Sequence, residues 1–250
     1  MRWKLEQILK KTGGGIVFED ESIIVINKPS GMLTAASAHE TASMNLYELL
    51  RESFPSVFVV HKVDADVSGL VVFAKTAEAQ DQLCTQFEQH KVKKQYLAIV
   101  HGVPKADSGI IELPLADDER CAGKKMVDRK KGIVAATEYI TIEHFDRYAL
   151  LGLSPHTERT HQIRVQLSAI KMPVLADPLY GDGQGFFLSF VKKNYKEKEP
   201  EKPLLARTAL HVAVLAVVHP LTKELLEWKT PLPKDMDSVL KYLRKFCAVS

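Results

Sequence analysis

The sequence predicts an α+β fold built around a mainly antiparallel sheet. Strand-like runs outnumber helical stretches, and the two do not alternate in a regular β-α-β rhythm. No internal repeat interrupts this pattern. The 250 residues are 46% hydrophobic and 26% charged, which is ordinary for a globular protein and excludes collagen, a coiled coil and wholesale disorder.

The predicted strands are short apolar runs bounded by glycine, proline or polar residues. They cover residues 16–18, 23–26, 57–60, 70–73, 95–100, 135–142, 148–153, 210–218 and 225–228. The predicted helices space their apolar residues three or four apart and cover residues 45–52, 77–90, 160–169 and 236–246. The last two strands form a hairpin around residues 219–222. We expect a short leader at residues 1–15 and a single domain at residues 16–250.

Several classes of protein are excluded by what the sequence lacks. The longest apolar run, residues 209–218, is too short to cross a membrane and contains His211. The first residues carry no apolar segment typical of a secretion signal. Three cysteines, far apart and without a Cys-x-x-Cys spacing, argue against a disulfide framework and a thiolate zinc site, so a reducing cytoplasm is expected. The glycine-rich run at 181–185 lacks the helix and third glycine of a dinucleotide loop.

Charge alone does not identify a partner, because the net charge is only +3. Residues 120–131 hold six basic side chains and one acidic, Asp128, and a second basic cluster holds Lys91, Lys93 and Lys94. Each cluster has two readings, a set of phosphate contacts or a solvated face. In residues 192–202 lysines alternate with glutamates, which favours a solvated loop.

The most informative segment is the loop at residues 61–69, His-Lys-Val-Asp-Ala-Asp-Val-Ser-Gly, between two apolar runs. Catalytic groups are often carried on such loops, but a surface turn capped by its own aspartates is the competing interpretation. A second polar set occupies residues 157–164. If a helix begins at Thr160, then Thr160 and Arg164 share one face, although an amphipathic helix with an exposed arginine explains this equally well. His156 and His161 have no third ligand at useful spacing, so no metal site is expected.

Taken together, these segments resemble the RluA-type pseudouridine synthases. That family typically shows His-Arg-Leu-Asp, two variable residues and Thr-Ser-Gly-Leu, which residues 61–70 follow, and then an apolar strand ending in Ala-Lys-Thr, as at 74–76. Other segments are similar to further family motifs in the same order along nearly the whole chain: residues 25–31, 94–96, 159–165 with 176–181, and 210–220.

The resemblance implies a pseudouridine synthase catalytic domain at residues 16–250, with a long, mostly antiparallel sheet, helices and a central RNA-binding cleft. It also implies that an N-terminal S4-type RNA-binding domain is absent. By matching positions, Asp64 is the essential aspartate, Tyr96 packs against the target base, and Arg164 pairs with the aspartate. The enzyme would extrude a uridine from structured RNA and isomerise it. No cofactor and no metal are implied.

Three positions depart from the family pattern. Lys62 replaces arginine and loses the planar fork that binds phosphate bidentately, Val63 replaces leucine, and Val67 replaces threonine. These changes put in doubt any transfer of a specific RNA target.

The expected partner is an RNA substrate, either ribosomal or transfer RNA, with no DNA and no membrane. A monomer in the cytoplasm is expected. The residues expected to contact RNA are basic or imidazole side chains in or near the motifs: His61, Lys62, Lys94, Lys124, Lys125, Arg129, Lys130, Lys131, Arg159 and His161.

Two other functions remain open. A non-catalytic RNA-binding protein or RNA chaperone would bind RNA and form no pseudouridine. A hydrolase using Ser68, His61 and Asp64 is disfavoured, because the serine lacks a nucleophile elbow and all three lie on one loop.

Overall fold

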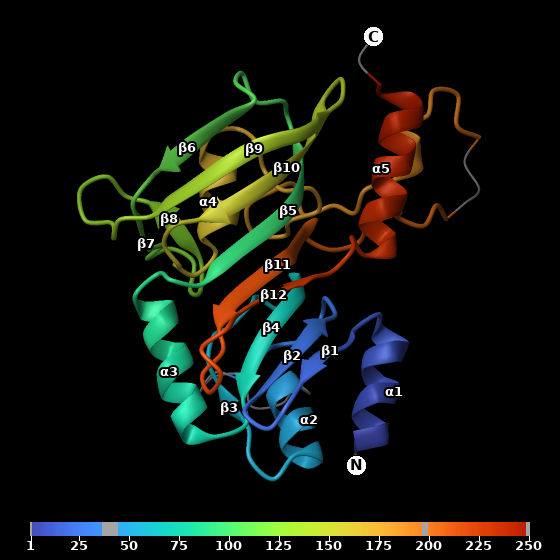
Figure 1. Ribbon diagram of the computed structural model, residues 1–250. Coiled ribbons are helices and arrows are strands. Elements are labelled where there is room, and N and C mark those ends of the chain that lie inside the picture. The colour runs from blue at the N-terminus through green and yellow to red at the C-terminus, as the bar shows by residue number, and fades with distance from the viewer. Residues whose placement is uncertain (1, 37–44, 197–199, 249–250) are drawn as a thin grey trace. The chain divides into compact units, whose positions relative to one another are not determined.

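The computed structural model of the protein describes residues 2–36, 45–196 and 200–248. Helices and a mostly antiparallel set of strands make up this part of the chain, so the predicted α+β class is confirmed (Figure 1). The chain divides into two compact units. Unit 1 comprises residues 1–94 and 211–231, and unit 2 comprises residues 95–210 and 232–250. Among the described residues, no helix combines the length and apolarity that a membrane crossing requires.

Unit 1 contains a sheet whose central strands are buried along nearly their whole length. Its strand order is β1 (Gly15–Glu19), β2 (Ile23–Lys28), β4 (Ser68–Ala74) and β11 (Leu210–Val218), with β3 (Phe58–Val59) on β4 and β12 (Leu225–Lys229) on β11. β4 and β11 pair in parallel, with Ser68 opposite His211, and the other pairings within the unit are antiparallel.

Three helices belong to unit 1: α1 (Arg2–Thr12), α2 (Leu46–Ser53) and α3 (Ala77–Glu88). α2 begins at Asn45, whose side chain accepts from the Glu48 N–H, and α3 begins at Thr76, whose hydroxyl accepts from the Ala79 N–H. α1 contacts α2 and β1, while α3 contacts β3 and β4 (Figure 1).

Unit 2 contains an antiparallel sheet and a separate two-stranded hairpin. The sheet order is β5 (Lys93–His101), β10 (Tyr148–Pro155), β9 (Ala136–His144) and β6 (Ser108–Glu112), and the hairpin joins β7 (Leu115–Asp117) to β8 (Lys125–Val127). Helices α4 (Gln162–Ala169) and α5 (Lys234–Phe246) and a short 3₁₀ turn η1 (Leu188–Phe190) complete the unit. Gln166 on α4 accepts a hydrogen bond from Thr137 on β9 at 2.7 Å, which fixes the helix against the sheet.

Three elements differ from the sequence prediction. The expected leader contains helix α1, which buries Leu5 and Leu9, an i, i+4 pair that predicts a helix. Strand β6 was not predicted, because its Ser-Gly-Ile-Ile-Glu sequence does not alternate. Helix α4 begins at Gln162, because His161 has a left-handed φ of 57°, so Thr160 lies outside the helix.

The solvated loop predicted at 192–202 lies only partly within the described residues, since 197–199 fall outside them. Of the described part, Lys192, Lys193, Lys196 and Lys202 are exposed.

Candidate active site

The loop at residues 61–69 of unit 1 is held through its main-chain carbonyl groups. The donors come from residues 28–34, the turn that follows β2. Four donors bind three carbonyl oxygens: Lys28 Nζ and the Gly31 N–H donate to Ala65 at 3.3 and 2.8 Å, Ser30 Oγ donates to Asp66 at 2.8 Å, and Thr34 Oγ1 donates to Val63 at 2.8 Å. The loop is therefore fixed on either side of Asp64.

Lys28 is the central donor of this arrangement. Its side chain is fully buried, and besides Ala65 its ammonium donates to the carbonyls of Pro29 at 3.1 Å and Met32 at 2.8 Å. A lysine ammonium has three N–H donors, and three carbonyls lie around this one. In the sequence, Lys28 stands out only as a member of the motif at residues 25–31. Its burial could not be predicted, because a single buried lysine produces no periodic hydrophobic pattern.

Asp64 and Asp66 are both half-buried. Before them in the loop, Lys62 is exposed and Val63 is buried. The turn after Asp64 closes through main-chain atoms, because the Val67 N–H donates to the Asp64 carbonyl at 3.1 Å. Replacing either carboxylate by an amide leaves this main-chain bond in place.

His61 supports the loop from beneath. It is buried, its Nε2 accepts from the Val72 N–H at 3.2 Å, and its ring stacks on Phe87 with centroids 4.4 Å apart. Lys94, also buried, places its Nζ 5.1 Å from the centre of the Phe87 ring. Burial, and then the charge of Lys94, hold the pKa of His61 well below its usual value, so His61 is neutral. The burial of His61 and Lys94 favours a supporting role over direct contact with phosphate.

Ser68 does not form the triad that a hydrolase would need. Its Oγ hydrogen-bonds to Nδ1 of His211 at 2.9 Å, whereas Nε2 of His61 is engaged by the Val72 main chain. Gly69 follows with φ of 117°, and a Cβ there would lie 2.3 Å from the Val212 carbonyl oxygen. Only glycine allows β4 to approach β11 this closely. The Ser-Gly pair therefore serves strand packing in unit 1.

In unit 2, Arg164 on α4 forms a buried bidentate ion pair with Asp177. Arg164 Nε lies 2.7 Å from Asp177 Oδ2 and Nη2 lies 2.8 Å from Oδ1, and the two side chains are 2% and 0% exposed. Burial opposes ionisation of Asp177, but hydrogen bonds and charge from Arg164, with the N–H groups of Leu179 and Tyr180, lower its pKa overall. Asp177 lies in the segment 176–181 that resembles a family motif, and the sequence alone assigned it no role.

Tyr180 lies beside this pair and connects it to other predicted residues. The guanidinium of Arg164 lies 5.3 Å from the ring centre, and Nζ of Lys124 lies 5.4 Å from it. The Tyr180 hydroxyl accepts from the Lys125 N–H at 2.9 Å and hydrogen-bonds to His161 Nδ1 at 2.8 Å. Unit 2 thus brings Arg164, His161 and both lysines together around one tyrosine.

Tyr96 and Arg159 occupy other parts of unit 2. Tyr96 is half-buried on β5, opposite Leu153 of β10. Arg159 is exposed, and its Nε donates to the Val134 carbonyl at 3.3 Å.

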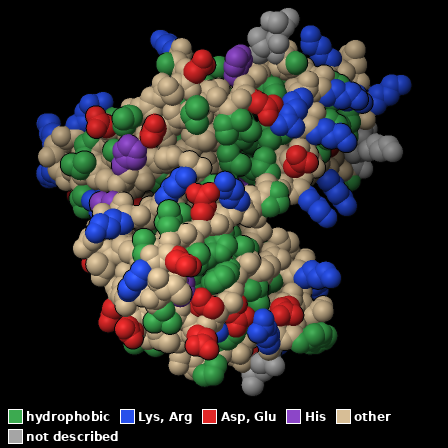
Figure 2. All heavy atoms as spheres, in the orientation of Figure 1, with side chains coloured by type: hydrophobic (Ala, Val, Ile, Leu, Met, Phe, Trp, Pro, Cys, Tyr) green, Lys and Arg blue, Asp and Glu red, His purple; other side chains and the backbone are tan. Residues whose placement is uncertain are grey.

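The basic stretch at 120–131 is less positive in the structure than its own residues indicate. The charge count in the sequence analysis covered residues 120–131 only. The three residues before them, 117–119, are all acidic, so residues 117–131 hold six basic and four acidic side chains. Lys125 pairs with Asp117 at 2.5 Å and Arg120 with Asp118 at 3.2 Å. Figure 2 shows basic and acidic side chains side by side at this end of unit 2. Three cations of the stretch that were predicted to bind RNA are exposed: Arg129, Lys130 and Lys131.

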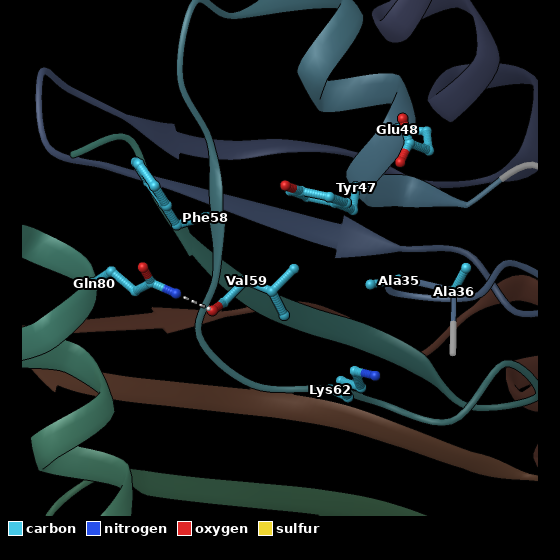
Figure 3. A pocket seen from close by; sticks show the side chains of 8 residues that line it. All are labelled: Ala35, Ala36, Tyr47, Glu48, Phe58, Val59, Lys62 and Gln80. Carbon is cyan, nitrogen blue, oxygen red and sulfur yellow. Dashed lines mark hydrogen bonds between the residues drawn. The ribbon is translucent and has the colours of Figure 1, made fainter. Parts of the chain in front are cut away.

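A hollow of about 380 Å³ opens in unit 1 beside the aspartate loop (Figure 3). Its walls come from α2, β3, α3 and the loop itself, and its lining residues are Ala35, Ala36, Tyr47, Glu48, Phe58, Val59, Lys62 and Gln80. Gln80 is fixed there, because its side-chain N–H donates to the Val59 carbonyl at 3.0 Å (Figure 3). Lys62 is thus the one residue of the 61–69 loop that also lines this hollow.

Comparison with known protein families gives a match to RNA pseudouridylate synthase over residues 22–169. Ribosomal large subunit pseudouridine synthase D of Haemophilus influenzae is 34% identical over 243 residues, which cover 92% of this chain and 70% of that protein. The uncharacterized RNA pseudouridine synthase YlyB of Bacillus subtilis is 32% identical and is covered to 73%. A synthase D of Neisseria meningitidis is 34% identical but covered only to 61%.

Solved structures agree on the fold. The human protein titled RNA pseudouridylate synthase domain containing 4 matches with a TM-score of 0.72 at 22% identity, over 98% of each chain. Human RNA pseudouridylate synthase domain containing 1 matches with a TM-score of 0.67 at 23% identity, over 96% of this chain and 98% of that one.

Proposed function

The chain belongs to the RNA pseudouridylate synthase family, and from this premise we propose that it modifies a uridine of ribosomal RNA with Asp64, Tyr96 and Arg164 as catalytic residues. It is an RNA pseudouridine synthase, an isomerase that detaches uracil from its ribose, turns it and rejoins it through carbon 5. Ribosomal RNA is favoured over transfer RNA, because the relatives named for a substrate are ribosomal large subunit synthases.

The observation that carries this proposal is the fixed loop around Asp64. A carboxylate that attacks a sugar, or removes a proton from it, must be held at a set position relative to the bound ribose. The donors from residues 28–34 hold the loop on both sides of Asp64 through the carbonyls of Val63, Ala65 and Asp66. Lys28, Ser30 and Thr34 then act as positioning residues for the reaction.

Arg164 is proposed to supply the positive charge that pairs with the reacting carboxylate. Asp177 engages Nε and Nη2, so the orientation of the whole planar guanidinium is set before RNA binds. Tyr180, against the guanidinium, limits its movement further. Asp177 and Tyr180 are positioning residues in this scheme.

Tyr96 provides the face on which the extruded base stacks, and base stacking on an aromatic side chain contributes about 1–3 kcal/mol. Tyr96→Phe should bind RNA nearly as well as the wild type, whereas Tyr96→Ala should lose about that amount of binding free energy. A Phe variant that binds RNA but turns over slowly would assign the hydroxyl to the removal of the carbon-5 proton. Equal binding by the Ala variant would leave Tyr96 as a packing residue.

The exposed cations Lys62, Arg129, Lys130, Lys131 and Arg159 are proposed to contact phosphates of the RNA. Residues 16–250 are proposed to form the catalytic domain, and the helix within residues 1–15 packs on α2 and β1 as part of unit 1. The predicted monomeric state and cytoplasmic location stay predictions.

Mapping of pseudouridines in total RNA, with and without the gene, tests the proposal and identifies the site. One or more ribosomal positions should lose the modification in the deletion strain. The purified protein should then release tritium from RNA labelled at carbon 5 of uridine, while Asp64→Asn should bind RNA and release none. Asp66→Asn, two residues away on the same loop, is the matched control and should retain most activity.

The alternative is a protein that keeps the fold and binds RNA without modifying it. It would be favoured if the wild type bound structured RNA yet released no tritium, and if the deletion strain lost no pseudouridine. An inactive Asp66→Asn beside an active Asp64→Asn would instead reassign the catalytic acid.

A further inference from the structure

The hollow beside the aspartate loop combines two aromatic side chains with one cation. Tyr47 comes from α2 and Phe58 from β3, and Figure 3 shows the Tyr47 hydroxyl directed toward the side on which Phe58 lies. The Arg51 guanidinium lies 5.7 Å from the centre of the Tyr47 ring and so supports that ring from α2 itself. Both aromatic side chains are only half-buried, so each leaves part of its surface accessible.

The position of Lys62 ties the hollow to the reaction. Lys62 stands two residues before Asp64, so their Cα atoms are at most about 7 Å apart. Stacked nucleotides along one strand rise by about 3.4 Å each. The spacing from a uridine at Asp64 to a nucleotide one or two steps along the strand therefore matches the spacing from Asp64 to Lys62, which lines the hollow.

We propose that this hollow binds the base of a nucleotide flanking the target uridine, stacked on Tyr47 and Phe58, with its phosphate against the Lys62 ammonium. The inference rests on the proposed function, because it takes Asp64 to be the residue that meets the target ribose. The volume of about 380 Å³ falls within the range of small-ligand pockets, about 300–1,000 Å³.

The charges around the hollow suit a nucleotide. Lys62 is exposed and carries the positive charge of the lining, while the acidic member, Glu48, has its carboxylate 3.6 Å from Arg51. Gln80 is tethered to the Val59 carbonyl and gives the wall a fixed polar edge. Stacking faces supply affinity that depends little on which base is present, so the site would tolerate several bases at the flanking position.

The test uses short RNAs that contain the mapped uridine and lack the base at one flanking position at a time, up to two steps on either side. For the wild-type protein, one of these abasic RNAs should raise KM at least about fivefold, the lower bound for the loss of one stacked base. Tyr47→Ala should raise KM for the intact RNA by a similar factor. For the Tyr47→Ala variant, removal of the base at that same position should raise KM little further, because the ring on which this base stacks is already absent.

Two further variants make the outcome specific. Tyr47→Phe keeps the ring, so it should raise KM much less than Tyr47→Ala does. Tyr242→Ala removes a similarly half-exposed tyrosine from α5 in unit 2 and should leave the abasic series unchanged. Thermal melting of each variant separates lost stacking from lost folding.

The proposal is overturned if, at every flanking position, KM rises by the product of the factor for Tyr47→Ala and the factor for base removal. The two changes would then act independently. It is also overturned if every abasic RNA is converted with the KM of the intact RNA. Failure of the proposed function would look different, because the wild type would then release no tritium from any RNA, and the KM comparison would not arise.

Discussion

The aspartate loop of unit 1 and the arginine of unit 2 are held in place by opposite means. The loop is fixed by neutral and cationic donors that bind the main-chain carbonyls of Val63, Ala65 and Asp66. Arg164 is fixed by its own charged group, which forms two short hydrogen bonds to a buried carboxylate. The loop that carries Asp64 is held through its main chain, whereas Arg164 is held through its charged side chain.

The difference teaches which residues can be changed without loss of the fold. A group positioned by its backbone can be replaced while its surroundings stay satisfied. A group positioned by a buried ion pair leaves an uncompensated charge behind when it is removed. Four substitutions test this contrast, arranged from the largest expected change in stability to the smallest.

Arg164→Met should cause the largest loss of stability. It leaves the Asp177 carboxylate, which is 0% exposed, without its cation, and breaking a buried pair in this way typically costs about 3–5 kcal/mol. Urea unfolding monitored by circular dichroism measures the change. Arg207→Met is the matched control, because its bidentate pair with Asp235 also lies in unit 2 but is partly exposed, at 13% and 35%. A smaller loss for Arg164→Met than for Arg207→Met would contradict the contrast.

Lys28→Met should cost about 1–3 kcal/mol, the usual penalty for leaving a buried polar group without its partner. The carbonyls of Pro29, Met32 and Ala65 would all lose the Nζ donor. Because the loop is then less firmly held, turnover by Asp64 should fall while RNA binding changes less. Urea unfolding and single-turnover kinetics give the two readouts, and an unchanged unfolding midpoint with full turnover would show that the other donors suffice.

His61→Gln should change the pH dependence of stability. The pKa of His61 is lowered in the folded protein, by burial and then by Lys94, so below its ordinary value of 6.5 the unfolded chain binds a proton that the folded chain does not. The wild type should therefore lose stability as the pH falls from 7.5 to 5, and His61 contributes up to about 1.4 kcal/mol per pH unit in that window. The contribution is absent above about pH 7.5.

Unfolding midpoints at several pH values measure this contribution. The His61→Gln variant should show a flatter profile, whereas His90→Gln, which changes an exposed histidine of the same unit, should retain the wild-type slope. Parallel profiles for the wild type and His61→Gln would rule out a buried neutral histidine.

Asp64→Asn should have the smallest effect on stability, within about 0.5 kcal/mol. The residue is half-buried, and the bond that closes its turn uses the main chain. Thermal melting should therefore barely change while tritium release disappears. A large loss of stability would mean that the Asp64 carboxylate itself holds the loop.

Much of the fold could be predicted because strands and helices leave periodic patterns. The buried strands β2 and β4 are continuous apolar runs, and α3 carries its N-terminal cap at Thr76. Helix α1 could have been found from Leu5 and Leu9, but the charged residues on either side of this pair led to the prediction of a leader. The start of α4 could not be found, because a positive φ is uncommon outside glycine and nothing in the local sequence marks His161 as one of the exceptions.

The proposed site residues could be named from the sequence, but the residues that hold them in place could not. Asp64, Tyr96 and Arg164 were chosen by resemblance, and their catalytic roles stay a proposal. The Asp177 partner of Arg164 depends on how the segment after α4 folds back, which no periodic pattern encodes. The positive charge of the basic stretch was overestimated, because the charge count began at residue 120 and left out the acidic residues 117–119. Asp117 lies opposite Lys125 in the β7–β8 hairpin and pairs with it.

The parallel pairing of β4 with β11 has a consequence for synthesis on the ribosome. Ser68 and His211, which share a hydrogen bond, are 143 residues apart. At about 5–20 residues per second, the segment that follows the aspartate loop waits roughly 7–29 seconds for its neighbouring strand to emerge. During that interval β2 and β3 can pair with β4, but its end at Ser68 and Gly69 lacks the strand that β11 will supply, and an unpaired strand end is a site for pairing with another chain.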